Sequence, residues 1–180
     1  MKALLDACVL YPTVLREILI GTAAQGLYEP LWSERILEEW ARATVKLGPG
    51  AEAVARGEIA ALRAAWPRAT VTPGAALIGR LWVPDPNDIH VLAAAIAGGA
   101  DAIITFNAAD FPRHILAEEG LARMDPDQFL LALHDASPEE VAGVCGQVHA
   151  EAERLSGDEL EMRTLLKRAK LPRLGKRLAR

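Results

Sequence analysis

Four acidic residues, Asp6, Glu39, Asp88 and Asp110, lie at positions where a carboxylate is unexpected unless it has a specific role. Asp6 ends a short apolar segment, and Glu39 flanks the apolar side of a predicted helix. Asp88 opens a helix after a Pro-Asp-Pro turn, and Asp110 follows the apolar run 102–105. Carboxylates brought together from separate elements repel one another, and their burial costs several kcal/mol unless a cation compensates. Oxygen-only ligand sets suit Mg²⁺ or Mn²⁺, which catalyse phosphoryl-transfer hydrolysis.

Each of these acids also has a purely structural interpretation. Asp6 could accept hydrogen bonds from nearby backbone amides, and Glu39 could be a boundary residue that reaches water. At the third helical position Asp88 could serve the helix dipole, and Asp110 could belong to an Asx turn. Asp85 is the better N-cap of that helix, so we interpret Asp85 as structural.

Position along the strands and helices separates the candidates from their acidic neighbours. Asp6 and Asp110 follow predicted parallel strands, at the carboxyl ends where α/β sheets bind ligands. Asp101 lies at the opposite end of its strand and should be remote. At 100° per residue Glu39 flanks the apolar arc of its helix and Glu38 points nearly opposite, so Glu39 is the candidate and Glu38 the solvated residue.

Strand and helix signals alternate along the chain, which predicts an α/β fold with a mostly parallel sheet. The predicted strands cover residues 2–6, 29–32, 69–72 and 102–106. The predicted helices cover residues 12–25, 33–47, 51–66, 74–81, 87–97, 125–136, 137–155 and 158–170. After the last helix, Pro172 and Gly175 should loosen the chain. We therefore expect an α/β domain over residues 1–136 and a helical C-terminal extension over residues 137–180.

Composition narrows the class of protein. A hydrophobic content of 51% over 180 residues is enough for a folded core, and no apolar run approaches the ~20 residues of a membrane span. Cys8 and Cys145 are too few for a disulfide framework, and the four histidines lack zinc-type spacing. The first residues lead into a strand without a secretory signal. We expect a cytoplasmic protein without a membrane segment.

The charge of the chain is unevenly distributed. The net charge is −4, yet residues 163–180 carry eight Lys or Arg and no acid. The first 162 residues hold the other 12 basic side chains and all 24 acidic ones. The basic tail is either a solvated helix end that favours the helix dipole, or a contact with RNA phosphates or an acidic partner.

Four motifs occur in a familiar order. They are Leu4-Leu-Asp6-Ala-Cys8-Val-Leu-Tyr-Pro12, Ser33-x-x-Ile36-Leu-x-Glu39, Asp85-Pro-x-Asp88 and Ala100-Asp-x-Ile-Ile-Thr105-x-Asn107-x-x-Asp110-Phe. Together they resemble the PIN domain, and most closely the VapC-type toxins of bacterial toxin–antitoxin pairs. The resemblance covers roughly residues 1–115, and the helical remainder looks like the extension found in a subset of such proteins.

The resemblance implies a Rossmann-like, three-layer PIN fold that binds Mg²⁺ or Mn²⁺ at one sheet edge and cleaves RNA. It makes Asp6, Glu39, Asp88 and Asp110 the catalytic acids, with Asp6, Asp88 and Asp110 as metal ligands. Thr105 and Asn107 would line the site. The partners would be an RNA substrate, a cognate antitoxin protein and a second copy in a homodimer.

Two residues depart from the family pattern. Cys8 stands where many relatives have Asn, and a thiol should orient Asp6 only weakly. Asn107 stands where some relatives have an acid, so it offers a metal or water an amide oxygen but no charge. Arg16, on the helix after Asp6, either faces the substrate phosphate or is a solvated surface residue.

The expected reaction is in-line attack of water on an RNA phosphodiester, with Glu39 binding the metal or taking the proton. A haloacid-dehalogenase-type phosphatase also begins with an aspartate at a strand end, but it needs an acid where Cys8 stands. The other alternative is a PIN-like module with weak or no catalysis that acts through protein or RNA binding. A metal-dependent cleavage assay separates that module from the nuclease.

Overall fold

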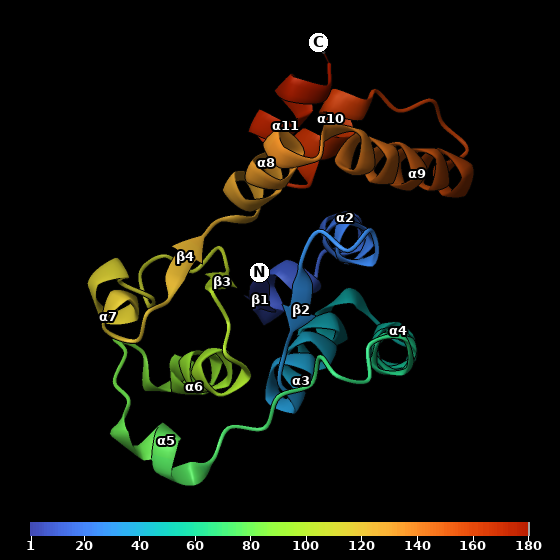
Figure 1. The fold of residues 1–180 in the computed structure, drawn as a ribbon. Coiled ribbons are helices and arrows are strands. Elements are labelled where there is room, and N and C mark those ends of the chain that lie inside the picture. Colours follow the sequence, from blue (N-terminus) through green and yellow to red (C-terminus); the bar gives the residue numbers. More distant parts are fainter. Residues whose placement is uncertain (180) are drawn as a thin grey trace. The chain divides into compact units, whose positions relative to one another are not determined.

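A computed structural model describes residues 1–179, and packing divides the chain into two compact units. The first, here called the sheet unit, contains Met1–Tyr11 and Glu29–Arg123. The second, the helical unit, contains Pro12–Tyr28 and the chain from Met124 onward. Figure 1 shows the elements of both units. These units follow packing and not chain order, and the division at residue 136 stays a prediction.

A four-stranded sheet forms the centre of the sheet unit. Its strands are β1 (Lys2–Leu5), β2 (Glu29–Leu31), β3 (Ala102–Ile104) and β4 (Ala122–Met124), in the spatial order β2-β1-β3-β4. β1 pairs in parallel with β2 and with β3, so Leu4 lies opposite both Leu31 and Ile103. β3 is buried along its whole length, as expected of a central strand in a parallel sheet. The predicted α/β fold with a mostly parallel sheet and flanking helices is confirmed.

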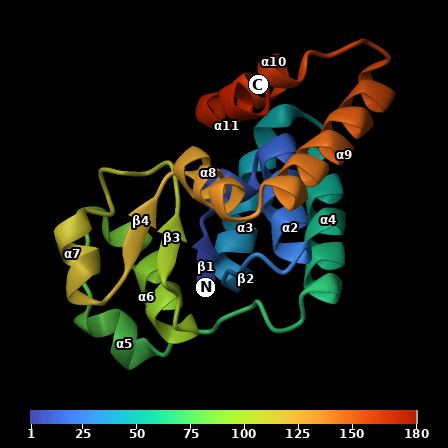
Figure 2. The same cartoon turned by 45° about the horizontal axis from the view of Figure 1, so that its top comes forward.

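Helices and short 3₁₀ segments surround this sheet. They are α1 (Ala7–Leu10), α3 (Glu34–Ala43), η1 (Thr44–Leu47), α4 (Ala51–Ala65), α5 (Ala75–Arg80), η2 (Pro86–Asp88), α6 (Ile89–Gly98) and α7 (Arg113–Glu118). α6 packs on β1 and β3, and Figure 2 shows it beside β3. The residues from His90 to Ala95 are all buried, because this helix is apolar nearly all round. α3 packs against α1 and α4.

The helical unit consists of α2 (Thr13–Ala24), α8 (Pro126–Ala136), α9 (Pro138–Ser156), α10 (Met162–Arg168) and α11 (Pro172–Leu178). α2 packs on α9, where a Cβ atom at Gly21 would lie 2.6 Å from a methyl group of Val144. Tyr28 packs edge-on against Phe129 with ring centroids 4.9 Å apart. Among the described helices, none combines the length and apolar character that crossing a membrane requires.

The sequence reasoning was wrong about several short elements. The predicted strand 69–72 is a single bridge between Trp32 and Thr70. α7 and β4 were not predicted, since each is too short to show a hydrophobic period. α11 forms where the chain should loosen, because Pro172 occupies the first helical turn. Gly175 lets α11 approach α10, since a Cβ atom there would lie 3.2 Å from Leu166 Cβ.

Candidate metal centre

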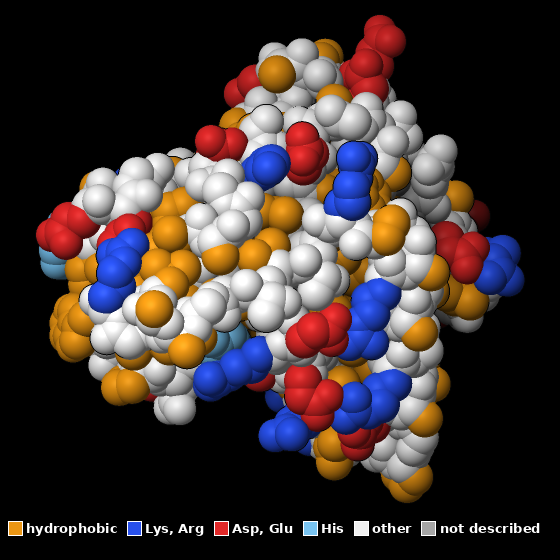
Figure 3. Space-filling view, turned by 60° about the horizontal axis from the view of Figure 1, so that its bottom comes forward, with side chains coloured by type: hydrophobic (Ala, Val, Ile, Leu, Met, Phe, Trp, Pro, Cys, Tyr) orange, Lys and Arg blue, Asp and Glu red, His pale blue; other side chains and the backbone are white. Residues whose placement is uncertain are grey.

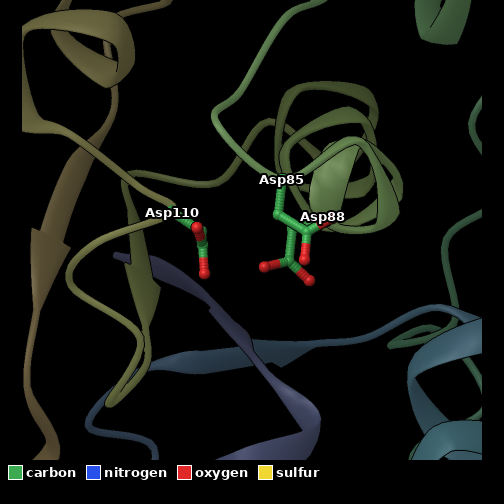
Figure 4. A group of neighbouring side chains, drawn as sticks. All are labelled: Asp85, Asp88 and Asp110. Atoms are coloured by element: carbon green, nitrogen blue, oxygen red, sulfur yellow. The ribbon is translucent and has the colours of Figure 1, made fainter.

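Three aspartates of the sheet unit bring their carboxylates together. Asp85, Asp88 and Asp110 each offer an oxygen, and these oxygens all lie within 4.8 Å of one another. Figure 4 shows Asp85 and Asp88 at the start of α6 and Asp110 on the loop that follows β3. Two elements distant in sequence thus supply one group of hard oxygen donors, which is the ligand type that Mg²⁺ and Mn²⁺ prefer.

Asp85 is therefore more than the structural cap that the sequence indicated. Its carboxylate does cap η2, because it accepts a hydrogen bond from the Asn87 amide at 2.9 Å. It also belongs to the group of three carboxylates. Asp88 is the third residue of η2 and makes no capping hydrogen bond at the start of α6.

Asp6 is held rigidly beside this group. Its side chain is only 8% exposed, and Oδ1 accepts a hydrogen bond from the Ala7 amide at 2.7 Å as the N-cap of α1. Oδ2 accepts a hydrogen bond from the Thr105 hydroxyl at 2.7 Å. Asp6 is not one of the three carboxylates within 4.8 Å, but its negative charge reaches Asp88.

The pKa of Asp88 records this crowding. Burial and then the charges of Asp6, Asp110 and Asp85 raise the pKa of Asp88 from 3.8 to about 6. A carboxylate whose neighbours oppose its ionisation gains most from a bound cation. The raised pKa of Asp88 and the oxygen donors of the group therefore both favour the binding of a cation.

Thr105 and Cys8 both donate hydrogen bonds to the Asp6 carboxylate. Thr105 is 2% exposed, so it orients Asp6 and is not open to a substrate. The Cys8 thiol donates to Asp6 Oδ2 at 3.3 Å and accepts a hydrogen bond from the Phe106 amide at 3.3 Å. Burial and the Asp6 charge raise the pKa of Cys8 to about 12, which keeps the thiol protonated as a donor. Cys8 thus ties the end of β1 to the segment after β3.

Asn107 bridges two of the aspartates. Its Nδ2 donates to Asp88 Oδ2 at 2.9 Å, and its Oδ1 accepts from the Asp110 amide at 3.4 Å. Both partners fix the orientation of the amide group. That oxygen faces the Asp110 amide, and its expected use as a donor to a metal or water stays a prediction.

Arg123 was not recognised from the sequence. Its guanidinium donates to the carbonyl oxygens of Ala108 at 2.6 Å and of Phe111 at 2.8 Å. These two bonds span Asp110 and hold its loop in shape. Nothing in the local sequence marks this role, since Arg123 lies on the unpredicted strand β4.

Glu39 points to a different partner from Glu38, as helical phase predicts. Glu39 Oε1 lies 2.9 Å from His90 Nε2 and 3.3 Å from Arg35 Nε. Burial opposes ionisation of Glu39, but His90 and Arg35 outweigh it and lower the pKa of this carboxyl. Glu38 is not simply solvated, because it pairs with Arg42 and Arg56 at 2.8 Å each. Glu39 is not one of the three grouped carboxylates.

His90 is buried against Glu39, with 5% of its side chain exposed. The Glu39 oxygen lies at contact distance from Nε2 but off the hydrogen-bonding direction of the ring, and Nδ1 has no partner within residues 1–179. His90 and Glu39 therefore approach each other closely without forming a well-aligned hydrogen bond.

Arg16 lies on α2 in the helical unit. Its side chain is 4% exposed, so it is not the solvated surface residue that one interpretation offered. Its Nε atom lies 3.9 Å from Oε1 of Glu17. A role beside the substrate phosphate stays a prediction.

A family model described as the PIN domain matches residues 2–109. This match covers the segments that carry Asp6, Glu39 and Asp88, and it ends one residue before Asp110. No match was found among curated proteins or among solved structures.

Proposed function

Because the chain belongs to the PIN domain family, whose members are generally metal-dependent nucleases, we propose that it is a metal-dependent endoribonuclease. The observation that carries the proposal is the group formed by Asp85, Asp88 and Asp110, with Asp6 fixed beside it. Four acidic side chains, of which three raise the pKa of the fourth, Asp88, are a poor surface for RNA phosphate until a cation reverses the local field.

In this proposal Asp88, Asp110 and Asp6 hold Mg²⁺ or Mn²⁺, and Asp85 is a further oxygen donor. A divalent cation supplies the acidity of water and the neutralisation of phosphate charge that hydrolysis of a phosphodiester needs. The Thr105 hydroxyl, the Cys8 thiol and the Ala7 amide hold the Asp6 carboxylate in a fixed orientation.

Glu39 is the proposed proton acceptor for the attacking water. Its lowered pKa keeps the carboxylate ionised at neutral pH, so it is always in the accepting form. Arg35 contacts Glu39 and also donates to the Asn87 carbonyl at 3.1 Å, which links α3 to the turn that carries Asp88. Arg35 thereby positions the proposed base relative to the proposed ligands.

We also propose, on the sequence resemblance alone, that this nuclease is the toxin of a toxin–antitoxin pair. Co-expression with the product of the adjacent reading frame should relieve growth arrest if that is so. The homodimer and the cytoplasmic location stay predictions from the sequence.

RNA cleavage tests the proposed activity. The purified chain should cleave RNA with Mg²⁺ or Mn²⁺ and should stop when EDTA removes the metal. Asp6→Asn should abolish cleavage, whereas Asp101→Asn should not, because Asp101 serves the Lys2 amide at the far end of β3. Folded wild-type protein that leaves RNA intact under all metals would favour a binding module instead.

A further inference from the structure

The C-terminal helices form a basic hairpin, defined here as α10 and α11 with the three residues between them. Seven of the eight basic side chains after residue 162 fall within the described residues, and all seven are exposed. Arg180 lies outside the described part. The hairpin packs through apolar residues, since Leu166, Leu171 and Leu174 are fully buried. Figures 1 and 2 both show α10 beside α11.

Two of these cations attach the hairpin to α8. Arg173 pairs with Asp125 at 3.0 Å and with Asp127 at 3.1 Å, and Arg177 pairs with Asp135. The buried Asp127 also accepts the backbone amides of Arg173 and Leu174, at 2.9 and 3.0 Å. The hairpin is therefore a docked part of the helical unit and not a loose tail.

Four other cations of the hairpin have no carboxylate partner within the part of the chain that the structure describes. They are Arg163, Lys167, Arg168 and Lys176. Arginines elsewhere are commonly neutralised, for example Arg80 by Glu119 and Arg154 by Glu151, each at 2.6 Å. Figure 3 shows this mixing over α3 and α4, where acidic and basic side chains lie next to one another. The hairpin thus presents positive charge that the fold does not use.

We propose that this basic hairpin binds the phosphate backbone of RNA. The hairpin offers exposed cations, whereas none of its large apolar residues is exposed. Leu166, Leu171 and Leu174 are buried, and Met162, Leu165 and Leu178 are intermediate in exposure. A protein partner would need an exposed apolar centre, whereas phosphate contacts need only accessible cations. The first 162 residues carry twice as many acids as bases, so a polyanion needs such a surface to approach this chain.

The choice of RNA rests on the proposed function, since a ribonuclease must bind a polyanion. The hairpin is covalently linked to the sheet unit, so RNA held by one part is presented to the other at a raised effective concentration. Long RNA should gain from this attachment, and a fragment of a few nucleotides should not.

The test compares two variants with the same change in net charge, both in an Asp6→Asn background that cannot cleave. The hairpin variant carries Arg163→Gln, Lys167→Gln, Arg168→Gln and Lys176→Gln. The control carries Arg42→Gln, Arg63→Gln, Arg80→Gln and Arg154→Gln, which are exposed arginines paired with glutamates. Fluorescence anisotropy with a labelled 30-nucleotide RNA gives the affinity over a series of salt concentrations, and circular dichroism melting verifies folding.

The hairpin variant should bind RNA about tenfold or more weakly at low salt, and the slope of log K against log salt should fall by about 0.7 for each lost contact. The control should stay within about threefold of its parent. Equal loss in both variants would mean that net charge alone acts, and would overturn the proposal. Polyglutamate binding as tightly as RNA would also overturn it, in favour of an acidic protein partner.

The outcome is distinguishable from a failure of the proposed nuclease. The binding assay requires no cleavage, so an inactive wild type with hairpin-dependent RNA binding would reject only the catalytic proposal. Conversely, if the four hairpin substitutions are made in the active wild-type background and leave the KM for long RNA unchanged, only the hairpin proposal is rejected.

Discussion

Asp88 has a raised pKa because it is partly buried and lies near three other acids. Its folded-state pKa of about 6 lies above the unfolded value of 3.8, so the folded apo protein binds this proton more tightly than the unfolded chain does. The corresponding stability is fully present below pH 3.8 and is lost as the pH rises through about 6.

Asp88→Asn should remove this pH dependence in metal-free protein. Relative to wild type, the variant should gain stability as the pH rises from 4 to 7, by about 1 kcal/mol once solvent screening of a partly exposed group is allowed for. Urea unfolding of both proteins in EDTA across this range measures the difference. A difference that stays flat with pH would show that the neighbouring carboxylates do not act on Asp88.

Glu39 and Glu38 provide a matched pair on one helix. Glu39→Gln should lose most RNA cleavage, because an amide cannot accept the proton. Glu38→Gln should keep the wild-type rate, since Glu38 faces Arg42 and Arg56. The two rates are measured on one RNA at saturating Mn²⁺. Loss of activity in Glu38→Gln alone would show that the wrong face of α3 has been assigned to the site.

Residue types and order along the chain were enough to nominate Asp6, Glu39, Asp88 and Asp110 as candidates. They were not enough for Asp85, because a residue that makes a good N-cap gives no sign that its carboxylate also lies near two others. The role of Arg123 could not be predicted from the sequence for a related reason. Its role depends on the path of the loop around Asp110, which no local pattern encodes.

At the scale of elements, long periodic segments were predictable and short ones were not. α4 and α9 match their predicted ranges to within about a residue at each end, because amphipathic period and Gly or Pro boundaries agree. α11 contradicts its local signal, since packing of Gly175 on α10 and the attachment of Arg173 to α8 stabilise a helix that propensity disfavours.

The contact between Arg173 on α11 and Asp127 on α8 leads to a prediction about stability. Asp127→Asn should lower the free energy of unfolding by about 1–3 kcal/mol, because a buried carboxylate that accepts two backbone amides and a guanidinium is lost. Asp135→Asn is the control, since it removes an exposed ion pair and should cost less than about 1 kcal/mol. Urea unfolding compares the two. Equal effects would mean that Asp127 does not fix α11 to α8.

At the scale of the whole molecule, charge is divided between two tasks. The grouped carboxylates of the sheet unit are the proposed site for a divalent cation. The exposed cations of the hairpin are the proposed surface for RNA phosphates. The fold class could be predicted from the alternation of strands and helices. The division into packing units could not, because α2 joins α9 across more than a hundred residues of chain.

Binding of Mn²⁺ to the apo protein tests the central claim most directly. Electron paramagnetic resonance of free Mn²⁺, titrated with wild type, Asp110→Asn and Asp101→Asn, gives the affinity of each protein without any need for cleavage. We predict that wild type and Asp101→Asn bind Mn²⁺ equally and that Asp110→Asn binds at least about tenfold more weakly, because it loses one oxygen ligand and one charge. Equal affinity in all three proteins would show that the grouped carboxylates are not a metal centre.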